Sequence, residues 1–109
     1  MKNVVIAGGG DVGFSLARAL SEEGHNVSVI DIDEEVAVKL ESLDVLVVIG
    51  NAASPATLNR AYINSADVLI AVTASDEVNM ACCSIAKNRG CNTLARINNE
   101  EYTQEPIST

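Results

Sequence analysis

Residues 3–13 read NVVIAGGGDVG, a β-branched apolar run that leads directly into a glycine-rich turn. Gly8, Gly10 and Gly13 form a GxGxxG pattern where a strand should give way to a helix over residues 11–23. Gly8 permits a tight turn, Gly10 lets a diphosphate approach the backbone, and Gly13 lets the helix pack against the strand. The unpaired N–H groups and the dipole at the start of that helix attract anions, so the stretch favours a phosphate-binding corner.

The rest of the chain alternates short apolar runs with amphipathic stretches whose apolar positions recur every three or four residues. We expect strands over residues 3–7, 27–30, 45–49, 68–73 and 93–97, and helices over residues 11–23, 34–43, 76–88 and from Ser54–Pro55 onward. Residues 98–109 show no clear element. Strands that alternate with helices through short turns predict an α/β fold: a Rossmann-like, doubly wound parallel sheet in three α/β/α layers, forming a single domain.

Asp31 is the second half of the expected site. It ends the second strand and follows Gly13 at close to the usual spacing of about 20 residues in dinucleotide-binding folds. An acid there accepts hydrogen bonds from the ribose hydroxyls and repels a 2′-phosphate, so NADP is disfavoured. The acids at residues 33–35 deepen this negative field, although acids also stabilise a helix N-terminus. Asp11, inside the phosphate turn, disfavours ATP more than the diphosphate of NAD.

The ends of the third and fourth strands should complete the crevice, because ligands of such sheets bind at the carboxyl ends of strands. The small residues 50–52 could admit an adenine ring, and Ser75 is either a helix cap or a ligand contact. Arg96 points either to a ligand phosphate or to a carboxylate such as Glu77. The candidate cofactor-binding residues are Gly8, Gly9, Gly10, Asp11, Val12, Asp31, Ile32, Asn51, Ala52, Val72, Thr73 and Arg96.

Composition narrows the partners. The net charge of −8 argues against nucleic acid and anionic membranes, which attract basic surfaces, although acidity also serves general solubility. No apolar run approaches the ~20 residues of a membrane span, and the N-terminus resembles a strand rather than a signal peptide. Cys82, Cys83 and Cys91 match no metal-binding or CxxC spacing, so we expect small buried thiols, no metal site and a cytoplasmic location.

Four segments together resemble a known family: GGGDVGFSLARAL, GHNVSVIDIDEE, the long run from GNAASPATLNRAY to SIAKNRG, and ARINNEEY. They look like the nucleotide-binding RCK or KTN domain of potassium-transport regulators of the TrkA type, over residues 2–102. The resemblance implies a cytoplasmic peripheral subunit that forms dimers or rings beneath a membrane potassium transporter or channel. Bound NAD(H), or ATP, ADP or AMP in its place, would gate transport there.

By that likeness, Gly8, Gly10, Asp11 and Val12 would line the phosphates, Asp31 would hold the ribose, Asn51, Ala52 and Thr73 would border the adenine, and Arg96 would face the ligand. Relatives that prefer ATP often carry a basic residue where this chain has Asp11, which favours NAD(H). The family domain normally continues into a further strand and helix. We therefore expect the domain over residues 1–109 to be incomplete after about residue 102, so its oligomeric behaviour is left open.

The expected function is regulatory binding rather than catalysis. A dehydrogenase needs a proton donor or acceptor beside the nicotinamide, and the one histidine, His25, falls in a turn at the opposite end of the sheet. The alternative is the cofactor-binding half of an NAD-dependent dehydrogenase. An S-adenosylmethionine-binding domain also uses a glycine loop and an acid after the second strand, but GxGxxG spacing fits a diphosphate better.

Overall fold

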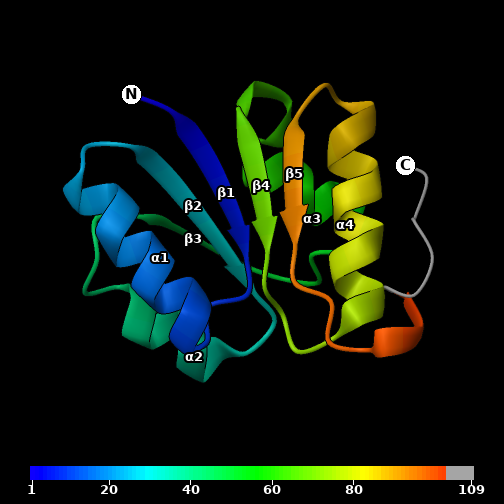
Figure 1. Cartoon of the computed structure of the whole chain (residues 1–109). Coiled ribbons are helices and arrows are strands. Elements are labelled where there is room, and N and C mark those ends of the chain that lie inside the picture. The colour runs from blue at the N-terminus through cyan, green and yellow to red at the C-terminus, as the bar shows by residue number, and fades with distance from the viewer. Residues whose placement is uncertain (103–109) are drawn as a thin grey trace.

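The computed structural model describes residues 1–102, and in them five strands form one parallel sheet in the order β3-β2-β1-β4-β5 (Figure 1). The strands are β1 (Asn3–Ala7), β2 (Asn26–Asp31), β3 (Leu46–Ile49), β4 (Val68–Ala71) and β5 (Asn92–Ala95). The helices are α1 (Asp11–Glu22), α2 (Glu34–Leu40), α3 (Pro55–Arg60) and α4 (Asp76–Asn88). The strand order reverses between β1 and β4, which is where ligands bind in open sheets of this kind.

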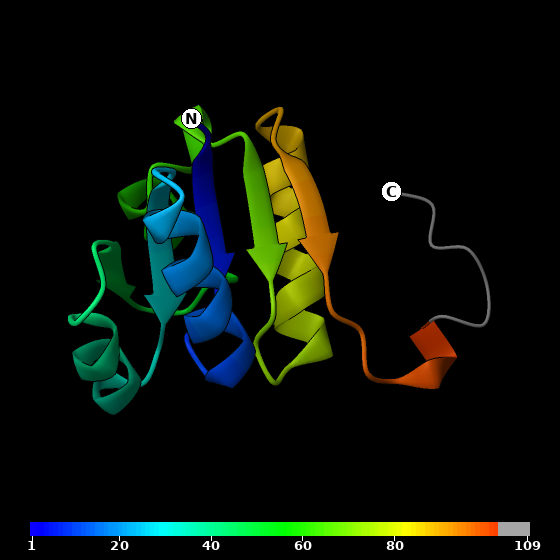
Figure 2. The ribbon, with the colours of Figure 1, turned by 60° about the vertical axis from the view of Figure 1, so that its left-hand side comes forward.

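Helices cover both faces of the sheet. Helices α1 and α2 lie on one face, and α3 and α4 lie on the other (Figures 1 and 2). Successive residues of β1 alternate between the two cores, because side chains of a strand point to opposite faces: Val4 and Ile6 pack with Leu40, whereas Val5 packs with Leu69. Two covered faces explain why the central strand β1 is apolar and buried over residues 4–7. The expected Rossmann-like, three-layer fold is confirmed.

The glycine-rich turn has the geometry that its sequence predicts. Gly8 adopts a φ of 105°, which few residues other than glycine accept. A Cβ on Gly13 would overlap the carbonyl oxygen of Gly8, so helix α1 approaches the strand as closely as a glycine allows. A Cβ on Gly10 would meet nothing within 4 Å, so this position opens onto free space.

Several elements are shorter than expected. Strand β4 stops at Ala71 rather than residue 73, and β5 ends at Ala95 rather than residue 97. Both end early because Thr73 N–H and the carbonyl of Arg96 bond to the side chain of Asn79 instead of to a neighbouring strand. Helix α2 ends at Leu40 rather than residue 43, and Leu43 N–H closes a tighter turn onto the carbonyl of Leu40.

Short 3-10 helices appear at Ile63–Ser65 and at Glu100–Tyr102. The second corrects the expectation of no element after residue 97, while residues 103–109 of that stretch lie outside the described residues. The remaining ends coincide with expectation or differ from it by one residue, which is within the usual spread of boundary definitions. Within residues 1–102, no helix combines the length and the apolar character needed to cross a bilayer.

Candidate functional site

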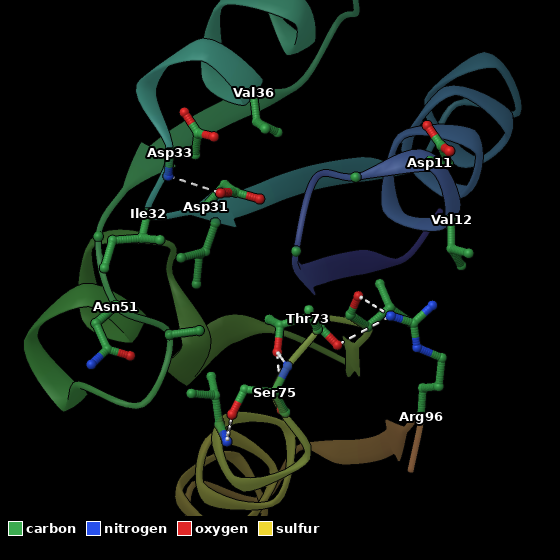
Figure 3. Close-up of a pocket in the computed structure, with 18 residues that line it drawn as sticks. Asp11, Val12, Asp31, Ile32, Asp33, Val36, Asn51, Thr73, Ser75 and Arg96 are labelled. Atoms are coloured by element: carbon green, nitrogen blue, oxygen red, sulfur yellow. Dashed lines mark hydrogen bonds between the residues drawn. The ribbon is translucent and has the colours of Figure 1, made fainter. Parts of the chain in front are cut away.

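A pocket of about 710 Å³ lies at the carboxyl edge of the sheet (Figure 3). Its wall comes from the end of β2 and from the segments that follow all five strands: residues 8, 10–12, 30–33, 36, 50–52, 72–75, 78 and 96. Every candidate cofactor-binding residue except Gly9 lines this pocket. Its size falls within the range of small-molecule sites, so the fold gathers the sequence-derived candidates around a space that fits a nucleotide.

Gly9 lies outside the pocket wall and contacts Asp31 and Leu40 instead. Its N–H donates to Oδ2 of Asp31 at 2.8 Å, and the N–H of Asp33 donates to Oδ1 of the same carboxylate at 2.9 Å. A Cβ on Gly9 would lie 2.7 Å from a methyl group of Leu40. Asp31 thus connects the glycine-rich turn to the turn before α2, while each of its oxygens keeps a second lone pair for a ligand.

The start of α1 faces the pocket without a side-chain cap. Gly10 is the N-cap residue in an extended conformation, and no side chain bonds to the first N–H groups of the helix. Such groups need a partner, which a ligand anion supplies well. Asp11, the first residue of α1, is exposed and lines the pocket, so its carboxylate offsets part of the attraction that the helix dipole exerts on an anion.

The opposite side of the pocket is suited to an apolar ring. Ile32 projects from the turn after β2 with 72% of its surface exposed, and the buried Ala52 lies in the turn after β3. The side-chain oxygen of Asn51 accepts the N–H of Ala53 at 2.9 Å, so its amide nitrogen is the group left to donate to a ligand. Gly50 must be small, because a Cβ there would lie 2.8 Å from the hydroxyl of the buried Thr57.

The turn after β4 is ordered by short-range hydrogen bonds. Ser75 Oγ accepts the N–H of Val78 at 3.2 Å, which confirms Ser75 as the N-cap of α4. The Thr73 hydroxyl lies 2.7 Å from Oδ1 of Asn79 and accepts the N–H of Ser75 at 3.2 Å. Thr73 therefore presents a fixed backbone at the pocket wall.

Arg96 has no acidic partner among residues 1–102. Its guanidinium donates to the carbonyl oxygens of Val72 at 3.3 Å and Thr73 at 3.2 Å (Figure 3). Its Nε is buried with no hydrogen-bond partner, and within residues 1–102 no carboxylate forms an ion pair with it. The alternative partner, Glu77, instead accepts the Tyr102 hydroxyl at 2.8 Å. Among residues 1–102, the guanidinium at the pocket wall thus bonds to neutral carbonyl oxygens and pairs with no carboxylate.

Groups for acid–base chemistry are scarce at the pocket. His25 lies at the far, amino edge of the sheet, where its Nδ1 accepts the N–H of Lys2 at 3.0 Å. The pocket wall, as far as residues 1–102 form it, contains no histidine, lysine, cysteine or tyrosine. Over the same residues, no cluster of histidine, cysteine, aspartate and glutamate is arranged to hold a metal ion.

Asn79 is a residue that the sequence analysis missed. It is completely buried on α4, and its side-chain amide contacts the turn after β4 and the end of β5. The available signal was its spacing: Asn79 shares a helix face with the buried Cys82 and Ala86. A buried polar amide beside such apolar side chains requires specific hydrogen-bond partners.

The strand order, the glycine-rich turn after β1 and the acid at the end of β2 place the chain in the Rossmann-like class of α/β domains. Residues 4–106 match the model of the TrkA-N domain, and the chain belongs to this family.

Similar proteins agree with this assignment. The chain is 41% identical to the Trk system potassium uptake protein trkA homolog 1 of Methanosarcina mazei, over 100% of the chain and 28% of that protein. It is also 41% identical to the TrkA homolog of Archaeoglobus fulgidus, over 95% of the chain and 24% of that protein. The chain thus spans about a quarter of the length of these relatives.

Solved structures share the fold. The Kef CTD of Shewanella denitrificans in its AMP-bound form superposes with a TM-score of 0.75 at 23% identity, covering 92% of this chain and 62% of that one. The NAD(P)-binding domain of an exopolyphosphatase-related protein from Archaeoglobus fulgidus gives 0.80 at 16% identity, covering 95% and 79%. At such identities the likeness concerns the fold alone.

Proposed function

We propose that this chain binds NAD or NADH in the 710 Å³ pocket and uses it as a regulatory ligand. The observation that carries the proposal is that the uncapped start of α1 and the carboxylate of Asp31 face the same pocket. One supplies N–H groups for a diphosphate, and the other supplies acceptors for a ribose. ATP, ADP and AMP share the adenosine and are the competing ligands.

The pocket suggests how the dinucleotide lies. Its diphosphate sits over Gly8, Gly10 and Val12, and its adenosine ribose bonds to Asp31. The adenine packs against Ile32 and meets Asn51 and Ala52 on the other side. The remaining part of the ligand lies beside Val72, Thr73 and Arg96. The positive charge of the Arg96 guanidinium offsets the repulsion between the Asp11 carboxylate and the phosphates.

Regulation fits the pocket better than catalysis does. A dehydrogenase uses a general acid or base beside the nicotinamide, and the described wall offers only the carboxylates of Asp11, Asp31 and Asp33, which we assign to the phosphate and ribose side. The similar proteins from Methanosarcina mazei and Archaeoglobus fulgidus are named as potassium uptake proteins. We therefore infer a module that controls potassium transport by a Trk- or Ktr-type membrane partner, from the cytoplasmic face and as a homo-oligomer.

Ligand binding controls such a partner only if the nucleotide has different affinities for two shapes of the module. The ligand bridges α1, the turn after β2 and the end of β5, so closure of the latter two segments toward α1 is the change that we infer. Oxidised and reduced nicotinamide differ by one charge, and a difference between their affinities makes the module sensitive to redox state.

A titration panel tests the proposal. Calorimetry and thermal shift with NAD, NADH, NADP, ATP, ADP, AMP and S-adenosylmethionine should give the largest stabilisation with NAD or NADH, because binding stabilises the folded state by RT ln(1 + [L]/Kd). Stabilisation by S-adenosylmethionine alone would refute the ligand class. Hydride transfer from NADH to a small carbonyl substrate would favour the dehydrogenase alternative. Co-purification with a Trk-type membrane subunit tests the partner, and light scattering tests the oligomer.

A further inference from the structure

The side chain of Asn79 uses its full hydrogen-bonding capacity on two residues of the pocket wall. Its Oδ1 lies 3.0 Å from the N–H of Thr73 and 2.7 Å from the Thr73 hydroxyl. Its Nδ2 donates to the carbonyl of Thr73 at 3.1 Å and to the carbonyl of Arg96 at 2.9 Å. An amide offers two acceptor and two donor positions, so none of them is left for a ligand or for water.

The hydrogen bonds of Asn79 take the place of backbone bonds where the pairing of β4 and β5 ends. The paired register of β4 and β5 stops at Ala71 and Ala95, and the last ladder bond runs from Arg96 N–H to the carbonyl of Ala71 at 2.9 Å. Beyond it, the backbones of the two segments are joined through the Asn79 side chain, and the Arg96 side chain adds direct bonds to the carbonyls of Val72 and Thr73. Asn79 therefore helps to fix the distance between the segments that follow β4 and β5 at the rim of the pocket.

Asn79 also binds the Thr73 carbonyl, which accepts a hydrogen bond from the Arg96 guanidinium. That guanidinium donates to the Thr73 carbonyl at 3.2 Å, and Nδ2 of Asn79 donates to the same oxygen at 3.1 Å. The backbone of Arg96 and the anchor of its side chain are thus both fixed from one buried point. Shifting either one changes where the positive charge lies in the pocket.

We propose that Asn79 is a positioning residue for phosphate recognition: it holds the end of β5 so that Arg96 presents its guanidinium to the bound nucleotide. The inference rests on the proposed function, because it requires that a phosphorylated nucleotide occupies the pocket. Asn79 itself is buried and lines no part of the pocket.

A double-mutant cycle with NADH tests this role. Calorimetry on the wild type, Asn79→Ala, Arg96→Gln and the double variant gives four affinities. We expect each single substitution to weaken NADH binding on the order of tenfold, the effect of misplacing one charge-assisted hydrogen bond. The double variant should bind as weakly as Arg96→Gln alone, because Asn79 acts through Arg96. Both single variants should also show a shallower dependence of affinity on salt concentration.

The controls separate this role from a general loss of stability. Ile63→Ala removes a fully buried side chain that lines no part of the pocket, so it should lower stability and leave NADH affinity unchanged. Asn79→Ser, whose hydroxyl and freed space let a water bridge the same groups, replaces Asn79→Ala if that variant does not fold.

Each outcome decides the question. If Asn79→Ala weakens NADH binding by the same factor in the wild type and in Arg96→Gln, the inference is overturned, because Asn79 then acts independently of the guanidinium. An unchanged affinity in a folded Asn79 variant overturns it as well. If wild-type protein binds no nucleotide, the proposed function fails first, and the inference fails with it. A loss of NADH affinity in the double variant that equals the loss in Arg96→Gln alone supports both the proposed function and the inference.

Discussion

The carboxylate of Asp31 and the N–H of Gly9 lie 2.8 Å apart, which joins the end of β2 to the glycine-rich turn across 22 residues of sequence. The acid that is expected to hold a ribose therefore also fixes the turn that is expected to hold the phosphates. Replacing Asp31 should affect both parts of the site, and stability and binding must be measured side by side.

Asp31→Ala should weaken NADH binding by roughly 1.5–3 kcal/mol, the range for hydrogen bonds to charged groups. It should also lower the free energy of unfolding by about 1–3 kcal/mol, because the N–H groups of Gly9 and Asp33 lose their acceptor. Calorimetry and urea unfolding measure the two effects. Asp44→Ala, an exposed acid away from the pocket, is the charge-matched control. Unchanged NADH affinity in folded Asp31→Ala would contradict the assigned role.

Gly10 and Gly13 should respond oppositely to alanine. Gly13→Ala places a methyl group into the carbonyl of Gly8, so α1 must shift and the protein should lose several kcal/mol of stability. Gly10→Ala meets no protein atom within 4 Å and should change stability by less than about 1 kcal/mol, yet it should impair NADH binding because the methyl group occupies the space for phosphate. Thermal unfolding with and without NADH distinguishes the two. Unimpaired binding in Gly10→Ala would place the phosphates elsewhere.

Asp11 should act as a selectivity element against polyphosphates. Its exposed carboxylate lines the pocket at the first turn of α1, where it repels the additional charge of ATP more than the diphosphate of NADH. Asp11→Asn should therefore raise ATP affinity by a larger factor than NADH affinity, and the gap should narrow at high salt. Competition titrations at two salt concentrations measure the ratio. Glu23→Gln, an exposed acid beyond the end of α1, should leave that ratio unchanged.

The three thiols should differ in reactivity. A hydrogen bond with Cys82 lowers the pKa of Cys83, whereas hydrogen bonding with Cys83 and burial raise the pKa of Cys82, and burial raises the pKa of Cys91. Because the thiolate is the nucleophile, iodoacetamide should label Cys83 first, with a half-maximal rate at a lower pH than a free cysteine shows. Mass spectrometry of the labelled peptides measures this order. Labelling in denaturant, where the three thiols should react alike, is the control; earlier modification of Cys91 contradicts the assignment.

The fold was predictable because its determinants are local. The apolar run of β1, the glycine-rich turn and the serine that caps α4 each specify their own segment, and right-handed crossovers leave few ways to assemble them. The strand ends were not predictable from propensity. Val72 and Thr73 suit a strand, but the side chain of Asn79 on α4 takes the N–H of Thr73 that would have extended β4.

The candidate site was predictable to the extent that it follows from strand order. Residues after the strands meet at one edge, which is why all but Gly9 line the pocket. The partner of Arg96 was not predictable, since sequence spacing cannot choose between Glu77 and the carbonyls of Val72 and Thr73. The position of Gly9 outside the pocket wall was not predictable for a related reason, since its contacts with Leu40 and Asp31 depend on how α2 and β2 pack.

The close approach of Gly13 to the carbonyl of Gly8 allows α1 only one packing position on the sheet. A helix held that tightly cannot slide to suit a longer or shorter anion. Adapting this scaffold to another nucleotide therefore calls for exchanging the side chains around the rim, such as Asp11, Ile32 and Asn51, while the backbone cradle stays as it is.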